Sequence, residues 1–420
     1  MNEPFSERDI IRMSMSIPVA ENTPVRVLRI QKPHVEYKDG QASQICEITC
    51  GEVKRTVIFS VPEAYGEYLT TERSDAYVLG LLSFAMRERC DIVCETPMTE
   101  ELLHQLRTEF LPALHKFEPK LHLPKIQAEV DGTPLACAGK VGTGCSCGVD
   151  SLTAIKHLTE SDCPGIHLDY LVLHNVGAYS WKGHVLEKRY EEGISNIQHF
   201  ANEYHYKILV TNSNISEAFP QLHEATHGYT IAFATYMLRK LWKRYYYASA
   251  GFEHQPAISL EGHANHAFGY YELFALQCFS IPQLRLCSES LVLSRFDKTR
   301  ELINYEPAHR FLNVCVRNSN RNCGECFKCK RTLLTLDALN ALDSFSHVFP
   351  VDAYRKNRAR YMRELYLSHL KHDSMLEGTY RILSPQIGLW NKIRVLLSIR
   401  GLRAIRDKIC NKRKPTVYDH

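Results

Sequence analysis

A short run of small and polar residues carries the clearest chemical signal in this chain. The run extends from Gly144 to Ser151, with the sequence GCSCGVDS, between an apolar stretch and a segment of helical period. This order predicts a strand, a tight turn and a helix N-terminus. A helix start offers backbone N–H groups and the positive end of a dipole, and small residues allow close approach, so the run suits a pyrophosphate group. A loop in which Asp150 merely caps the helix is the alternative.

A second chemical signal is a cluster of cysteines far downstream. The cluster comprises Cys315, Cys323, Cys326 and Cys329, in the spacing C-x7-C-x2-C-x2-C. Four thiolates at this spacing can complete a tetrahedral zinc site with no open position, which makes the metal structural. Buried or redox-active thiols and an iron–sulfur cluster are the alternatives. Since the chain shows no sign of secretion, we expect Zn²⁺ rather than disulfides.

Composition favours an enzyme of the cytoplasm. The chain has 420 residues, 45% of them hydrophobic, and an odd number of cysteines, 15. The N-terminal residues lack the basic and apolar parts of a signal peptide, and no uninterrupted apolar run is long enough to cross a bilayer. We therefore expect a cytoplasmic location, reduced thiols and no transmembrane segment.

The net charge of +4 is unevenly distributed along the chain. Between Gln386 and Lys414 there are nine basic residues and one acidic residue, Asp407, so this tail carries +8 and the remainder is mildly acidic. An acidic body argues against nucleic-acid binding by the general surface. Apolar residues recur in the tail at helical spacing. A helix docked on the protein's own body, contact with an anionic membrane surface, and contact with RNA or a protein partner all remain open.

Residues 1–130 are expected to form a mixed α/β domain in which no motif indicates catalysis. Short strand-like runs and helix-period segments alternate there, and prolines at 119, 124 and 134 indicate a connector to the next domain. The expected strands are Val25 to Ile30, Ile45 to Thr49, Thr56 to Val61 and Asp91 to Glu95, and the expected helices are Asp75 to Arg89 and Thr99 to His115.

From Leu135 the pattern becomes strand, helix, strand, which predicts a doubly wound parallel sheet with helices on both faces. Ligands of such sheets bind beyond the carboxyl ends of the strands, so residues that follow each strand are candidates. The expected strands are Ala136 to Cys145, Asp169 to His174, Lys207 to Thr211, Tyr245 to Ala250 and Leu284 to Cys287; the expected helices are Ser151 to Leu158, His184 to Tyr204, Thr230 to Lys243 and Asp297 to Asn304. The carboxyl-end rule selects the loop at Ser146, the turn from His174 to Gly177, Thr211 to Ser213, and Ser288 to Ser290.

A polar, glycine-containing loop after the fourth of these strands is a candidate for lining the substrate site. Its polar groups include Glu261, His263 and His266, and the two histidines have no obvious third ligand for a second metal. Tyr270 and Glu272 follow. Aromatic faces beside a carboxylate suit a flat heterocycle or a sugar, although packing explains the tyrosine equally well.

The glycine loop resembles the Ser-Gly-Gly-X-Asp-Ser fingerprint of the PP-loop ATP pyrophosphatase superfamily, which cleaves ATP to AMP and pyrophosphate. The matching residues are Ser146, Gly148, Asp150 and Ser151, with Val149 at the variable position and Cys147 where the first glycine is usual. The resemblance implies a HUP-like fold and an ATP site at this loop. It also implies that the turn at His174, Asn175 and Gly177 lies beside the nucleotide. The segment from Ser294 to Thr299 looks like the lysine-bearing helix start of the superfamily, which implies that Lys298 faces phosphate.

The order of these features resembles the 7-cyano-7-deazaguanine synthase family over residues 135–345. The stretch from Cys323 to Arg331, CGECFKCKR, is especially close. The resemblance implies three parts: residues 1–130 as an extra domain, 135–345 as the ATP-binding domain with its four-cysteine zinc knuckle, and 346–420 as a basic helical tail. Where the synthase has an Arg-Asn pair, this chain has Thr226 to Tyr229, so we expect a substrate other than the deazaguanine.

The chemistry that the resemblance implies is adenylation of a carboxylate, followed by attack of ammonia to give an amide or a nitrile. ATP, Mg²⁺ and Zn²⁺ are the implied cofactors, with Asp150, Ser151 and Lys298 at the reacting phosphates. The acceptor would be a small-molecule or modified-nucleobase carboxylate, and the N-terminal domain or the tail would bind a protein partner. Two alternatives remain open: a sulfurtransferase that acts on tRNA, and a non-catalytic ATP-binding component of a bacterial defence or biosynthetic complex.

Overall fold

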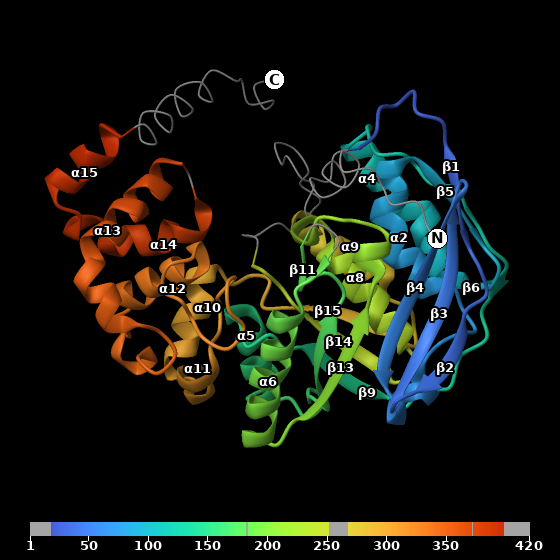
Figure 1. The fold of residues 1–420 in the computed structure, drawn as a ribbon, viewed down its shortest axis with the longest axis horizontal. Helices are drawn as coiled ribbons and strands as arrows, with labels where there is room; N and C mark the ends of the chain where they lie inside the picture. Colours follow the sequence, from blue (N-terminus) through green and yellow to red (C-terminus); the bar gives the residue numbers. More distant parts are fainter. Residues whose placement is uncertain (1–17, 182–183, 252–267, 372, 399–420) are drawn as a thin grey trace. The chain divides into compact units, whose positions relative to one another are not determined.

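The computed structural model describes residues 18–181, 184–251, 268–371 and 373–398 (Figure 1). Contacts divide the chain into two units, and each is described by itself. Unit 1 comprises Met1–Cys145 and His157–Leu291, and unit 2 comprises Ser146–Lys156 and Val292–His420. The glycine loop and the first turns of the helix after it therefore group with the C-terminal part of the chain.

Unit 1 contains a largely parallel sheet, as the sequence predicts. Five parallel strands lie in the order β15-β14-β9-β10-β13. The chain runs outward from β9 through β10 to β13 and then returns to the other side of β9 at β14, which creates a topological switch point beside β9. The elements are β9 (Lys140–Gly144), α5 (Val149–Thr159), β10 (Tyr170–Asn175), α6 (Glu187–Glu203), β13 (Lys207–Ser213), α7 (Ile215–Ala218), α8 (His223–Met237), β14 (Trp242–Ala248), η3 (Phe268–Tyr270), α9 (Glu272–Phe279) and β15 (Arg285–Glu289).

The N-terminal segment extends the same sheet and does not form a separate one. Strand β4 pairs antiparallel with β13 through Ser60 and Phe59, and the order continues β4-β3-β1-β5-β7, with β2 beside β3. The elements are β1 (Arg26–Ile30), β2 (His34–Lys38), β3 (Gln41–Cys50), β4 (Val53–Pro62), η1 (Glu63–Tyr68), α2 (Asp75–Glu88), β5 (Cys90–Cys94), β6 (Met98–Thr99), α3 (Glu100–Gln105), η2 (Leu106–Phe110), α4 (Leu111–Phe117), β7 (Ile126–Gln127) and β8 (Val130–Asp131). Two-residue pairings join β6 to β8, and β11 (Ser180–Trp181) to β12 (His184–Val185). The predicted boundary between residues 130 and 135 thus falls inside unit 1.

Both faces of the parallel strands are covered because successive side chains alternate. On one face Val141 packs with Leu158 of α5 and Tyr246 of β14. On the other, Gly142 makes room for Trp242, since a Cβ on Gly142 would lie 2.9 Å from the indole ring. That face shares one core with α2 and α8, which pack against each other.

Several predicted elements have other bounds in the structure: the predicted strand from Ala136 is β9 from Lys140 only, the predicted helix from His184 begins as β12, and the predicted helix from Asp297 to Asn304 is α10 followed by η4. Two further helices differ more. The predicted helix to Lys243 ends at Met237, and β14 already begins at Trp242, because this residue pairs with Lys140 before a register shift at Arg244. The predicted helix from Thr99 to His115 is divided into α3, the π-helical turn η2 and α4.

The regular elements in the described part of unit 2 are all helices. Its elements beyond the start of α5 are α10 (Arg295–Glu301), η4 (Leu302–Asn304), α11 (Glu306–Phe311), α12 (Phe327–Ala338), η5 (Asp343–Phe345), α13 (Val351–Leu370), α14 (Ser374–Leu383), η6 (Ser384–Gln386) and α15 (Leu389–Leu396). Helices α12, α13 and α14 pack on one another, so the predicted division at residue 346 also falls inside a unit. Helix α15 packs on α13 and buries Val395 but exposes Trp390. None of the described helices is long and apolar enough to cross a membrane.

A buried ion pair ties the N-terminal segment to the parallel half of unit 1. Arg239, just after α8, donates to Asp75 of α2 at 2.7 Å, and the two side chains are 3% and 1% exposed. Asp75 also accepts hydrogen bonds from the backbone N–H and hydroxyl of Thr99. Since these three residues come from distant parts of the chain, the network fixes their packing.

Replacing Arg239 by methionine is expected to reduce the free energy of unfolding by about 3–5 kcal/mol, because Asp75 would remain buried without its cation. The matched control is Lys240→Met. Lys240 forms a more exposed pair with Glu72, for which we expect a loss below about 1 kcal/mol. Urea unfolding measures both values. Similar losses for the two variants would contradict the role given to the buried pair.

Candidate functional site

The glycine loop leaves the sheet at the carboxyl end of β9, beside the switch point. Helix α5 follows at Val149, and its first internal hydrogen bond runs from the Leu152 N–H to the Gly148 carbonyl at 3.0 Å. The amides of residues 149–151 therefore precede the internal ladder of the helix, where helix starts present N–H groups to anions. The predicted arrangement of strand, turn and helix is observed.

Hydrogen bonds within the loop hold its two serines together. The Ser146 and Ser151 hydroxyl oxygens are 3.3 Å apart, and the Gly148 N–H donates to the Ser146 hydroxyl at 3.3 Å. Cys147 is fully buried and has a φ of 52°, in the left-handed region that favours glycine. Its carbonyl accepts from the Asn313 N–H at 2.8 Å, which fixes the loop within unit 2. A cysteine thus adopts a backbone conformation that glycine adopts more readily.

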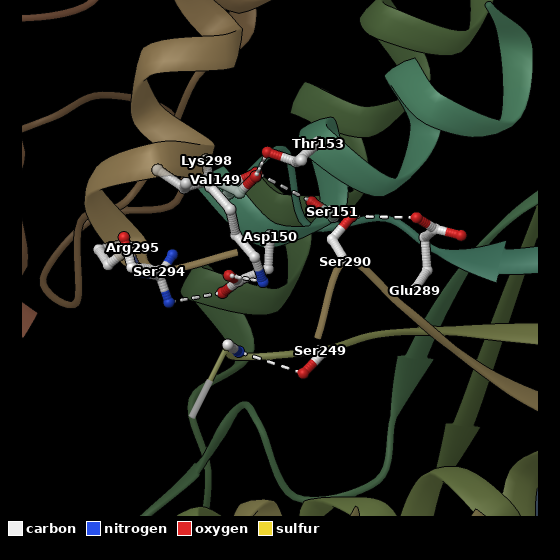
Figure 2. Close-up of polar contacts among 12 residues, drawn as sticks. Val149, Asp150, Ser151, Thr153, Ser249, Glu289, Ser290, Ser294, Arg295 and Lys298 are labelled. Carbon is white, nitrogen blue, oxygen red and sulfur yellow. Dashed lines mark hydrogen bonds and ion pairs between the residues drawn. The ribbon is translucent and has the colours of Figure 1, made fainter. Parts of the chain in front are cut away.

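Two cations of α10 converge on Asp150 (Figure 2). Arg295 donates to one carboxylate oxygen at 2.7 Å and Lys298 to the other at 3.2 Å. Lys298 is completely buried, and the Arg295 side chain is 12% exposed. Although burial opposes ionisation, these two cations hold the pKa of Asp150 below its usual value. Asp150 is therefore a carboxylate at working pH, and it supplies the anion that a lysine near a helix start requires.

A third cation, Arg331 of α12, completes this cluster. Burial and the nearby positive charge of Arg295 lower the pKa of Arg331 to about 10, whereas Asp150 and Asp373 act in the opposite direction. Sequence reasoning singled out Lys298 but neither arginine. Arg295 lies three positions before Lys298 and so shares its helix face, a signal that the spacing already offered. Arg331 follows the last cysteine ligand by two positions, and no local pattern indicates where it points.

The four predicted cysteine ligands come together in unit 2. Their sulfur atoms all lie within 4.8 Å of one another, and three of the four residues are buried. Sulfurs at 2.3 Å from a tetrahedral zinc ion are about 3.8 Å apart, so the cluster can hold a metal such as zinc. Backbone N–H groups support the sulfurs: that of Cys326 donates to Cys323, and that of Cys329 donates to Cys326 at the start of α12. Despite burial, N–H donors lower the pKa of Cys326 to about 7, which favours the thiolate that a metal requires.

The remaining predicted nucleotide contacts belong to unit 1. His174 lies within β10, is buried, and shares a hydrogen bond of 2.7 Å between its Nδ1 and the Thr211 hydroxyl. Burial lowers the pKa of His174 to about 3, so the ring is neutral, and its Nε2 has no hydrogen-bond partner among the described residues. Asn175 donates to Asn212 at 2.6 Å. Gly177 has a φ of 121°, and a Cβ there would lie 2.5 Å from the Ser216 hydroxyl oxygen, so this turn requires glycine.

Of the predicted substrate residues, Glu272 has the clearest surroundings. Its carboxylate is buried and accepts hydrogen bonds from Ser249, just after β14, at 3.0 Å and from Ser288 of β15 at 2.5 Å. Glu272 thus lies at the carboxyl edge of the sheet. Tyr270 is half-buried, and burial raises its pKa. Glu261, His263 and His266 lie outside the described residues.

The carboxyl-end rule also selected Glu289 and Ser290, which form a local network. Glu289 contacts Nδ1 of His157 at 2.9 Å, and the Ser290 hydroxyl lies 3.1 Å from the same nitrogen. Although burial opposes the shift, His157 lowers the pKa of Glu289. Because both neighbours meet one nitrogen of the ring, the three side chains do not form the relay of a serine nucleophile, in which the serine and the acid use opposite nitrogens.

No protein-family model, curated protein or solved structure matches this chain. Two arrangements of side chains bear on its function: the cations around Asp150 and the cysteine cluster.

Cys326→Ser is expected to abolish stoichiometric zinc and to lower the melting temperature together, because structural zinc contributes on the order of 10 kcal/mol to folding. Metal content by mass spectrometry and melting by circular dichroism test this. Cys163→Ser is the control, because Cys163 is exposed and outside the cluster. Unchanged zinc content and melting in Cys326→Ser would contradict a structural metal.

The neutral state of His174 predicts an acid-sensitive fold. Between its usual pKa of 6.5 and its value of about 3 in the fold, the unfolded chain binds a proton that the folded chain does not. Stability should therefore fall as pH decreases below 6.5, by up to about 1.4 kcal/mol per pH unit from this group. His174→Gln should flatten the slope of unfolding free energy against pH, and His199→Gln, at an exposed position, should not. Equal slopes in all three proteins would show that His174 is not the cause.

Proposed function

We propose that this chain binds ATP at the loop from Ser146 to Ser151 and transfers AMP to a carboxylate, with release of pyrophosphate. The observation that best supports it is that the buried Lys298 and the largely buried Arg295 both bond to Asp150. Asp150 lies at the start of a helix that follows the central strand of a parallel sheet. Cations, helix N–H groups and paired hydroxyls together suit a polyphosphate. This combination supports binding of a nucleoside triphosphate over binding of an uncharged ligand.

Each group in the loop has a distinct part in this proposal. The amides of residues 149–151 and the hydroxyls of Ser146 and Ser151 donate to the β and γ phosphates. Lys298 and Arg295 stabilise the charge that accumulates on the leaving pyrophosphate. No protein nucleophile is required, because positioning and charge stabilisation provide most of the acceleration in such transfers.

The proposed reaction balances in two steps. A carboxylate oxygen of the acceptor attacks the α phosphorus, and the bond from that phosphorus to the bridging oxygen breaks, so that pyrophosphate leaves. Ammonia then attacks the acyl carbon, loses a proton and displaces AMP to give an amide. A second adenylation, on the amide oxygen, followed by loss of AMP and a proton, would give a nitrile.

Unit 1 contains buried polar side chains that suit a ligand of its own. His174 Nε2, Asn175 Oδ1 and the Tyr245 hydroxyl are buried without hydrogen-bond partners among the described residues. Buried polar atoms are normally paired, so these atoms favour a ligand that is hydrogen-bonded there. Glu272 adds a buried carboxylate.

The residues present do not fit a resident magnesium ion. Both oxygens of Asp150 are hydrogen-bonded to cations, and the positive charge of these cations opposes the approach of Mg²⁺. The zinc proposed for the cysteine cluster would be structural, since four thiolates leave no open position for chemistry.

Sulfur transfer is less well supported than adenylation. Cys147 is the thiol in the loop, and it is fully buried, whereas a sulfur carrier must be accessible to its donor. The clustered cysteines suit a metal instead.

Formation of AMP tests the proposal. Purified protein with ATP, Mg²⁺, ammonium and a panel of carboxylates should release AMP and pyrophosphate, detected by chromatography. Lys298→Met should reduce the rate at least 100-fold because it removes a buried charge from the phosphates. Lys330→Met is the matched control: this lysine of unit 2 pairs with Glu364 outside the cluster and should keep the rate within about twofold. ATP binding without AMP formation for any acceptor would instead favour the non-catalytic ATP-binding role.

A further inference from the structure

The charge balance around Asp150 favours an anion over a metal ion. The electrostatic partners in this cluster include three cations, Arg295, Lys298 and Arg331, and two carboxylates, Asp150 and Asp373. These five described side chains together carry a net positive charge, and the N-terminus of α5 adds the positive end of its dipole. Asp297, also on α10, is engaged elsewhere: it pairs with Arg300 at 2.7 Å and accepts from Ser294.

Unpaired hydrogen-bond donors in the cluster also favour an anion. The Nε atoms of Arg295 and Arg331 are buried and have no hydrogen-bond partner among the described residues. A guanidinium group donates from several nitrogens in a planar fork, and phosphate oxygens match that fork. Buried donors without a partner are costly. A multivalent oxyanion would satisfy these donors and the excess charge at once.

The Asp150 carboxylate is the anion that pairs with the cations in this structure. Its two oxygens bond separately to Arg295 at 2.7 Å and to Lys298 at 3.2 Å. A divalent metal that approached Asp150 would meet the positive charge of Arg295 and Lys298, which opposes its binding. A phosphate group would instead take the place of the Asp150 carboxylate beside these cations, and it carries more negative charge.

We propose that Arg295 and Lys298 capture a polyphosphate anion without a divalent metal, exchanging the Asp150 carboxylate, their internal counter-ion, for phosphate oxygens. Asp150 then competes with the ligand and is not a magnesium ligand. The inference rests on the proposed polyphosphate site but not on the transfer of AMP. Arg295 becomes a ligand-binding residue, and the affinity of the site is set by competition between Asp150 and phosphate.

The test is calorimetric titration of the full-length protein with inorganic pyrophosphate, in EDTA and in excess Mg²⁺. We expect binding in EDTA that is at least as tight as binding with Mg²⁺. Asp150→Asn, which keeps the shape of the side chain and removes its charge, should tighten binding in EDTA about fivefold. Arg295→Gln should weaken it at least tenfold, or about 1.4 kcal/mol. Arg300→Gln, on the same helix but paired with Asp297, should leave it unchanged.

Three results would overturn the inference. Binding that requires Mg²⁺, and that Asp150→Asn abolishes, would make Asp150 a metal ligand; AMP formation could then still occur, so the proposed function would survive. Binding in EDTA that Arg295→Gln does not weaken would place the anion elsewhere. Absence of pyrophosphate and ATP binding in either buffer would remove the ATP site and the proposed function together. Melting curves of each variant confirm that loss of binding does not reflect unfolding.

Discussion

The ion pairs of Asp150 constrain most of what is distinctive in this structure. They join the start of α5 to α10, two segments that are more than 140 positions apart. Together with the hydrogen bond from Asn313 to the Cys147 carbonyl, they hold residues 146–156 within the C-terminal unit while β9 remains in the sheet. The chain passes from one unit to the other between Cys145 and Ser146, at the start of this loop.

The cysteine cluster and the cation cluster share a structural element, α12. Cys326 caps this helix, Cys329 lies in its first turn, and Arg331 follows two positions later. A metal bound by the four sulfurs would fix the start of α12 and, with it, the backbone from which Arg331 reaches toward Arg295 and Asp150. Such a metal would have no open coordination position for chemistry. It would still influence the anion site, because it would position Arg331, one of the three cations there.

The parts of this molecule that local patterns encode were predictable from the sequence, and the parts that depend on distant pairing were not. The parallel strands, the helix after the glycine loop and the four clustered cysteines follow from hydrophobic period, glycine placement and ligand spacing. The joining of residues 26–127 to the same sheet depends on a short contact between β4 and β13 and on the ion pair of Asp75 with Arg239. Neither contact leaves a local pattern. For the same reason the resemblance of the segment from Ser294 to Thr299 indicated Lys298, whereas no local pattern indicated Arg331.

Cys147 shows that neighbouring groups can impose a backbone conformation that the residue type itself disfavours. A left-handed backbone costs a non-glycine residue roughly 1–2 kcal/mol, which is a reason to expect a different turn. Here the turn is held on both sides: Ser146 accepts from the Gly148 N–H, and the Cys147 carbonyl accepts from Asn313. Complete burial of the Cys147 side chain removes apolar surface from water, which offsets part of the backbone cost. The conformation is therefore imposed by neighbouring groups and not by the residue itself, so the helix start keeps the geometry that an anion needs without the glycine.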